Sequence, residues 1–200
     1  MISAILLAAG QSSRMNGVNK LCKKIDGIPL IQHSTKNILN SSINELIIVV
    51  GYEKEKIENI IGVNKRIRFV YNKDFVKGMS SSIKIGLSHI SKKSEAFFIC
   101  LGDMPKINQS IYNKLIKSRS NYNKKINYKY KKDIIIPVYD GVKGNPILFS
   151  SLMKNQIMSI QGDHGAKSII DANKEKVLNV KINSKSIIED FDKIKNFKDL

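Results

Sequence analysis

Apolar residues in this chain gather in short continuous runs, and amphipathic stretches separate the runs. Continuous rather than alternating runs are typical of strands that are covered on both faces of a sheet. They predict strands over Ile2–Ala9, Glu45–Val50, Ile67–Tyr71, Ala96–Leu101, Asp133–Val138, Pro146–Phe149 and Val177–Ile182. Apolar residues at helical spacing predict helices over Pro29–Leu39, Lys54–Ile61, Ser80–Ile90, Ser110–Lys117, Ser150–Ser159 and Ala166–Ala172.

The alternation of strands and helices predicts the α/β class, an α/β sandwich with a mainly parallel sheet. A length of 200 residues is little more than that of one typical domain, so we expect a single domain over 1–200. No apolar run approaches the roughly 18 residues of a membrane span. The first ten residues lack the basic flank and cleavage site of a signal peptide. We therefore expect a cytoplasmic protein that does not associate with a membrane.

The charge balance is strongly basic, with 34 lysines and arginines against 17 acidic residues, a net charge of +17. Such an excess raises the possibility of nucleic-acid binding. A dedicated nucleic-acid surface would cluster its charge and use arginine. The lysines here are instead spread over the whole chain, and the only arginines are Arg14, Arg66, Arg68 and Arg119. We interpret the excess as a solvated lysine surface rather than as a nucleic-acid site.

One low-complexity segment, residues 118–132, combines basic residues with Tyr122, Tyr128 and Tyr130. Tyrosines among basic residues could stack on the bases of a single strand. A polar surface connection between two elements is the alternative, and we favour it.

The loop after the first predicted strand holds the richest chemistry. It contains Gly10, two small hydroxyl residues, Ser12 and Ser13, and two cations, Arg14 and Lys20. Backbone amides, hydroxyls and cations are the parts of a polyphosphate cradle. The spacing matches neither the Walker A loop nor G-x-G-x-x-G. An ordinary surface loop with turn glycines is the alternative.

Asp103 directly follows the apolar run Ala96–Leu101, between Gly102 and Pro105. In a parallel sheet, ligands collect beyond the carboxyl ends of the strands. An acidic residue there can bind Mg²⁺, which would neutralise charge on a pyrophosphate leaving group. The alternative is an aspartate that caps a helix or closes a turn. We favour the metal, because the predicted phosphate loop lies at the same edge.

Three further polar turns precede helices or apolar runs, Gly78–Ser82, Gly144–Pro146 and Gly162–Ala166. Serines in the first turn are commonly helix caps, but they could also contact a ribose or a base. His164, in the last turn, could be a substrate contact, an acid or base, or a purely structural residue.

Together these motifs resemble the signature of the MobA-like NTP transferase superfamily, which includes the molybdenum cofactor cytidylyltransferases. The resemblance covers nearly the whole chain. The first motif is shared widely among nucleotidyltransferases, but the joint occurrence of all five is specific. The motifs are Leu7–Met15 with Asn19–Leu21, Gly78–Ile83, Leu101–Pro105, Gly144–Phe149 and Gly162–Ala166.

The resemblance implies a Rossmann-like three-layer sandwich of the nucleotide-diphospho-sugar transferase type. It implies a Mg²⁺-dependent transfer of CMP from CTP to molybdopterin cofactor with release of pyrophosphate. Arg14, Lys20 and Asp103 would be catalytic, and Asp103 would hold the Mg²⁺. The nucleotide would contact Leu7, Ala8, Ala9, Gly10, Ser12, Ser13, Arg14, Lys20, Ser80, Ser82 and Gly102. The pterin substrate would contact Gly144, Asn145, Pro146, Asp163, His164 and Gly165.

Two positions refine this expectation. Guanylyltransferases related to this family carry a second glycine where this chain has Ala9, so the resemblance favours CTP as donor. Near the C-terminus the family has an Asp-x-Asp-Thr-Pro-like segment. Here Asp190 and Asp192 preserve the acidic pair, but the Thr-Pro turn is absent. Asp192 is therefore a second candidate metal ligand, and a cap for a helix over Lys193–Leu200 is the alternative.

The alternatives within the enzyme class are a guanylyltransferase and a nucleotidyltransferase acting on a sugar or alcohol phosphate. A non-catalytic protein that delivers the cofactor to a client molybdenum hydroxylase is the alternative from outside that class. Nucleic-acid binding through residues 118–132 ranks last.

Overall fold

The computed structural model describes residues 1–12, 18–125, 131–163 and 165–192. Its strands are β1 (Ile2–Ala8), β2 (Lys24–Ile25), β3 (Ile28–Pro29), β4 (Glu45–Val50), β5 (Ile67–Tyr71), β6 (Ala96–Leu101), β7 (Ile134–Tyr139), β8 (Val142–Lys143), β9 (Ile147–Ser150) and β10 (Val177–Lys181). Its α-helices are α1 (Leu30–Leu39), α2 (Lys54–Ile61), α3 (Met79–His89), α4 (Gln109–Lys125), α5 (Lys154–Met158) and α6 (Lys167–Ala172).

The main sheet has the strand order β10-β7-β9-β6-β1-β4-β5, and β8 pairs with β7 at its side. Strands β6, β1, β4 and β5 are parallel neighbours, and β10 is parallel to β7. Strand β9 runs antiparallel to both β6 and β7. Because β9 is reversed, it begins at the edge of the sheet where β6 ends. The turn before β9 is therefore placed beside the carboxyl ends of the parallel strands.

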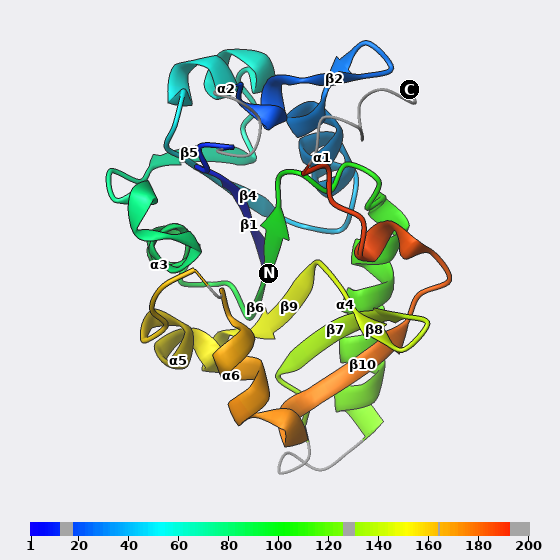
Figure 1. The fold of residues 1–200 in the computed structure, drawn as a ribbon. Coiled ribbons are helices and arrows are strands. Elements are labelled where there is room, and N and C mark those ends of the chain that lie inside the picture. The colour runs from blue at the N-terminus through cyan, green and yellow to red at the C-terminus, as the bar shows by residue number, and fades with distance from the viewer. Residues whose placement is uncertain (13–17, 126–130, 164, 193–200) are drawn as a thin grey trace.

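Helices cover both faces of the sheet, which makes three layers (Figure 1). Helices α1, α2 and α4 contribute apolar residues to the core on one face. Helices α3, α5 and α6 contribute to the core on the other face. Strands β1, β4 and β6 lie in the middle and are almost completely buried. Burial on both faces explains why their sequences are continuous apolar runs.

The predicted class, an α/β fold with a mainly parallel sheet, is confirmed. The interpretation of residues 118–132 as a surface connection is wrong for residues 118–125, which form the last turns of α4. Only Ile111, Tyr112 and Leu115 of this helix are buried, so its second half carries no apolar stripe that would reveal it in the sequence. Residues 126–130 lie outside the described residues. In the part of the chain that the structure describes, no helix is long and apolar enough to cross a membrane.

Candidate nucleotide-binding site

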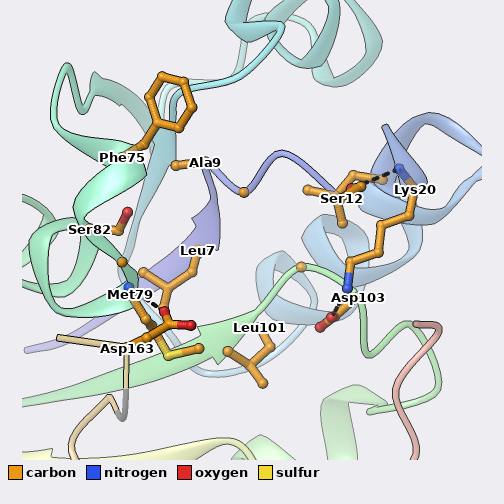
Figure 2. Close-up of a pocket in the computed structure, with 14 residues that line it drawn as sticks. Leu7, Ala9, Ser12, Lys20, Phe75, Met79, Ser82, Leu101, Asp103 and Asp163 are labelled. Atoms are coloured by element: carbon orange, nitrogen blue, oxygen red, sulfur yellow. Dashed lines mark hydrogen bonds and ion pairs between the residues drawn. The ribbon is translucent and has the colours of Figure 1, made fainter. Parts of the chain in front are cut away.

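A cavity of about 220 Å³ lies where β1 and β6 end (Figure 2). Two of the predicted motifs meet in it, the loop after β1 and the turn after β6. The close approach of the two is built into the backbone, since the Gly102 amide donates to the Leu7 carbonyl at 3.1 Å. A Cβ at Gly102 would lie 2.9 Å from that carbonyl oxygen, so glycine is needed there.

One end of the cavity is charged. The Lys20 ammonium donates to Asp103 at 2.6 Å and also contacts Asp192. These three side chains are largely buried, with relative exposures of 17%, 17% and 27%. Burial lowers the pKa of Lys20, but the two carboxylates outweigh it and raise the pKa above its ordinary value. Lys20 therefore remains a cation at the point where a phosphate chain would need one.

The backbone of Lys20 is held by Ser12, whose hydroxyl accepts a hydrogen bond from the Lys20 amide at 3.1 Å. Ser12 adopts a left-handed conformation with φ of 52°. The loop is thus closed by a side-chain bond, with residues 13–17 between its two ends. Asn19, which is fully buried, fixes the next turn by accepting from the Leu21 amide at 3.1 Å.

Asp192 contacts Lys20 from residues 189–192, which we call the C-terminal strap. The Phe191 amide donates to the Asp103 carbonyl at 3.0 Å, and the Phe191 side chain is buried. Glu189 is paired with Lys106 at 3.4 Å and with Lys185 at 3.2 Å. The backbone bond, the buried ring and the ion pairs together place Asp192 beside Asp103.

The carboxylates of Asp103 and Asp192 converge on a single cation, the ammonium of Lys20. Burial and the charges of these two carboxylates raise the pKa of the nearby Asp190. Hard oxygen donors of this kind suit Mg²⁺, which is commonly held by one or two carboxylates together with substrate phosphates. No group of three or more metal-binding side chains occurs among the described residues. The donor set therefore fits a cation that is completed by the oxygens of a bound triphosphate.

The other end of the cavity is largely apolar, and Asp163 is its charged residue. Figure 2 shows Phe75, Ala9 and Ser82 together there, away from Lys20 and Asp103. A Cβ on Gly51 would lie 2.8 Å from the Phe75 ring and 2.8 Å from the Ala9 carbonyl oxygen. The absence of a side chain at Gly51 therefore lets Phe75 pack close to Ala9. An aromatic ring beside a small residue is suited to a flat base.

The start of α3 is joined to the turn around Gly162. The Met79 amide donates to the Asp163 carboxylate at 2.8 Å, and the Ser80 amide donates to the Gly162 carbonyl at 3.1 Å. Gly78 has φ of +96°, which favours glycine. Asp163 thus caps α3 and also lines the cavity.

A second cavity of about 400 Å³ adjoins the first and shares Met79 and Leu101 with it. Gly144, Asn145 and Gly165 line it, so two predicted substrate turns come together here. The Asn145 amide donates to the Ile187 carbonyl at 2.8 Å, which fixes the turn before β9. Apolar side chains from β6, β7, β9, α3 and α6 form much of the wall, with Lys143, Lys167 and Asp171 as charged groups.

The predicted nucleotide residues Leu7, Ala9, Gly10, Ser12, Lys20, Ser82 and Gly102 all line the first cavity. Ala8 and Ser80 are buried and do not line it. Ser13, Arg14 and His164 lie outside the described residues. Leu21, Phe75, Met79 and Leu101 also line the cavity. Leu21, Met79 and Leu101 lie within the predicted motifs but were assigned no contact, and Phe75 lies outside every motif. Apolar residues in strands and loops carry no signal that separates a cavity wall from the core.

A loop with Ser12 and Lys20 after β1, two convergent carboxylates and an adjoining second cavity lie on a mainly parallel sheet, an arrangement that suits a nucleotide-binding transferase. The sequence agrees, because residues 4–177 match the model of the MobA-like NTP transferase domain. The chain belongs to this family and is a nucleotidyltransferase.

A relative in Escherichia coli (strain K12), molybdenum cofactor cytidylyltransferase, is 28% identical over 149 residues, which span 74% of this chain and 70% of the relative. The crystal structure of Rv0371c from Mycobacterium tuberculosis H37Rv superimposes with a TM-score of 0.82 at 17% identity, over 99% of this chain and 96% of the other. A manganese complex of that protein superimposes with a TM-score of 0.73 at 15% identity, over 92% of this chain and 89% of the other. At these identities the two structures support the fold alone.

Proposed function

We propose that this protein transfers CMP from CTP to molybdopterin cofactor and releases pyrophosphate. The observation that carries the proposal is the shared wall of the two cavities, because nucleotidyl transfer needs a donor and an acceptor side by side. The cytidylyltransferase relative supports the choice of substrates. We further propose that residues 1–200 act as one domain in the cytoplasm, for a client molybdenum hydroxylase and without a nucleic-acid or membrane partner.

In the proposed reaction a terminal phosphate oxygen of the acceptor attacks the α-phosphorus of CTP. The bond from that phosphorus to the bridging oxygen breaks, and pyrophosphate leaves with the electron pair. Phosphoryl-type transfer asks the protein mainly for positioning and for charge neutralisation. Lys20 supplies a buried cation for the triphosphate, and we assign Arg14 the same role from the sequence motif.

We assign the metal to Asp103 and Asp192, whose carboxylates already converge on one cation. Bound Mg²⁺ would supply charge neutralisation on the leaving pyrophosphate. When the triphosphate is bound, Lys20 is free to turn from these carboxylates to phosphate oxygens. The protein thus offers a cationic and an anionic group that change partners when the nucleotide binds.

At the acceptor side, Gly144, Asn145 and Gly165 line the second cavity, and we propose that they contact the pterin, together with Pro146 and His164 of the same turns. Its wall of isoleucines offers an apolar face for a flat ring system, and Lys143, Lys167 and Asp171 offer partners for polar atoms of the pterin. Asp163 lines the first cavity, so its contact would be made at the boundary of the two sites.

The first test is a thermal-shift series with Mg²⁺ and CTP, GTP, ATP or UTP on the wild type and on Asp103→Asn. Ligand at a hundredfold excess over its dissociation constant should add about 2.7 kcal/mol of apparent stability. We expect selective, Mg²⁺-dependent stabilisation by CTP that is weaker in Asp103→Asn. Pyrophosphate release with authentic molybdopterin cofactor then tests the acceptor. Stabilisation by GTP alone, turnover only with sugar phosphates, or CTP binding with no pyrophosphate release would each contradict the proposal.

A further inference from the structure

Ser82 is the hydroxyl residue of α3 that lines the cavity beside Phe75 and Ala9, at the end that we call the nucleoside end (Figure 2). It lies one residue after Ser81, and both serines contact the side chain of Asn72. Asn72 follows β5, is only 2% exposed and does not line the cavity. A buried amide behind a hydroxyl controls which way that hydroxyl can donate.

The orientation of the Asn72 amide is determined by the backbone. The Asp74 amide donates to Asn72 Oδ1 at 3.0 Å, so this atom is the carbonyl oxygen and the NH₂ group points the other way. Asn72 Nδ2 donates to Ser81 Oγ at 2.8 Å and to Ser82 Oγ at 3.0 Å. An NH₂ group cannot accept, so each serine oxygen receives a hydrogen bond from Asn72.

The two serines differ in where their own hydrogens go. The Ser81 hydroxyl has carbonyl acceptors on Gly78 at 2.8 Å and on Asp74 at 3.0 Å. Among the described residues, the Ser82 oxygen accepts from Asn72, and its hydroxyl donates no hydrogen bond in return. Because Asn72 occupies one side of Ser82 Oγ, this hydrogen is available to the cavity.

We propose that Asn72 is a positioning residue that makes Ser82 a hydrogen-bond donor toward an acceptor atom of the cytosine base. This inference rests on the proposed function, since it assigns CTP to the cavity. Asn72 never touches the nucleotide; it determines the polarity of the group that does. Carbonyl oxygens or ring nitrogens of the base are the matching acceptors.

Asn72→Asp tests this polarity with almost no change in shape. One carboxylate oxygen can still accept from the Asp74 amide, but the other now accepts where an NH₂ group donated. The Ser82 hydroxyl would turn toward this carboxylate and present a lone pair to the cavity. An acceptor of the base would then face the lone pair of Ser82 Oγ, which is repulsive. Ser82→Ala removes that oxygen, so the double variant Asn72→Asp with Ser82→Ala should bind CTP better than Asn72→Asp alone.

The experiment measures dissociation constants for CTP and for inorganic tripolyphosphate, each with Mg²⁺. We expect Ser82→Ala to weaken CTP binding about tenfold, the loss of one hydrogen bond. Asn72→Asp should weaken it about a hundredfold, and the double variant should return to the Ser82→Ala value. Tripolyphosphate binding should stay unchanged in all three variants, because it uses only the charged end.

Asn113→Asp is the matched control, because Asn113 accepts from the Ser42 amide at 2.8 Å and lies outside both cavities. It adds the same charge and should leave both affinities unchanged. Should Asn72→Asp fail to fold, Asn72→Ala takes its place. Asn72→Ala must weaken the binding of CTP but not that of tripolyphosphate. Adding Ser82→Ala to it must cause no further loss of CTP affinity.

A double variant as weak as Asn72→Asp, or an Asn72 variant with wild-type CTP affinity, would overturn the inference. A wild type that binds tripolyphosphate but no CTP would instead overturn the proposed function.

Discussion

The two ends of the nucleotide cavity differ in the interactions that position their side chains. At the charged end, the Lys20 ammonium lies between the carboxylates of Asp103 and Asp192 and forms an ion pair with each of them. At the nucleoside end, one neutral hydrogen bond joins Asn72 to Ser82, which lines the cavity together with the Phe75 ring. In the proposed reaction the charged end exchanges partners when the nucleotide binds, whereas the hydrogen bond between Asn72 and Ser82 is already present without it. Affinity from charge and selectivity from polarity can therefore be altered separately.

The largest effect is expected at the charged end, from Asp103→Asn. Asparagine keeps the shape but removes the charge that we assign to the metal, so pyrophosphate release should fall roughly a thousandfold. Chelation of divalent cations should abolish turnover of the wild type to a similar extent. Thermal unfolding of the variant provides the control for folding. Near-normal turnover would exclude Asp103 from the metal site.

Lys20→Ala should lower kcat/KM for CTP about a hundredfold, because a buried cation for the triphosphate is lost. The same change should strengthen binding of Mn²⁺ in the absence of nucleotide, since the ammonium no longer competes for the two carboxylates. Electron paramagnetic resonance of free Mn²⁺ measures this directly. Weaker Mn²⁺ binding in Lys20→Ala than in the wild type would show that the lysine and the metal do not share those oxygens.

Phe191→Ala tests whether the charged end depends on the C-terminal strap. The ring is 4% exposed, and truncating a buried phenylalanine costs about 3–5 kcal/mol when the site cannot collapse. We expect the lower part of this range, because the strap lies at the margin of the core. Denaturant unfolding measures the loss. The variant should also bind Mn²⁺ more weakly at temperatures where it is folded. Unchanged Mn²⁺ affinity would show that the Phe191 ring is not needed to position Asp192.

Gly51→Ala affects the nucleoside end alone. Its Cβ would lie 2.8 Å from the Phe75 ring, and overpacking of this kind typically costs about 1–3 kcal/mol. The displaced ring should weaken CTP binding several-fold and leave tripolyphosphate binding unchanged. Isothermal titration with both ligands separates the two effects. Equal weakening of both would show that the two ends are not independent.

The smallest effect is expected from Glu189→Gln in the strap. Burial raises the pKa of Glu189, but the ion pairs with Lys185 and Lys106 outweigh it and lower the pKa below 4.5. A depressed pKa stabilises the fold above pH 4.5 and loses this contribution as the pH falls through the lower folded value. The variant should be less stable by about 0.5 kcal/mol at pH 7 and equal to the wild type in strong acid. Urea unfolding at several pH values tests this.

The sequence predicted best those strands and site residues that a single local pattern identifies. The buried strands β1, β4 and β6 were visible as apolar runs, and Lys20 and Asp103 were visible because they lie in the polar loops that follow β1 and β6. Asn72 had no such signal, since a single asparagine after a strand is common in turns. Phe75 is an ordinary apolar residue until folding brings it against Ala9. The pairing of Lys20 with Asp192 spans 172 positions, so no local pattern could reveal it.

The C-terminal strap is synthesised long after the other residues of the charged end. Lys20 leaves the ribosome 172 positions before Asp192, an interval of roughly 10–35 s at typical translation rates. Throughout that interval the growing chain has the cation of the charged end and, later, Asp103, but not the second carboxylate. The order of synthesis therefore delivers the lysine before either acid, and the charged end is complete only when Asp192 has been added.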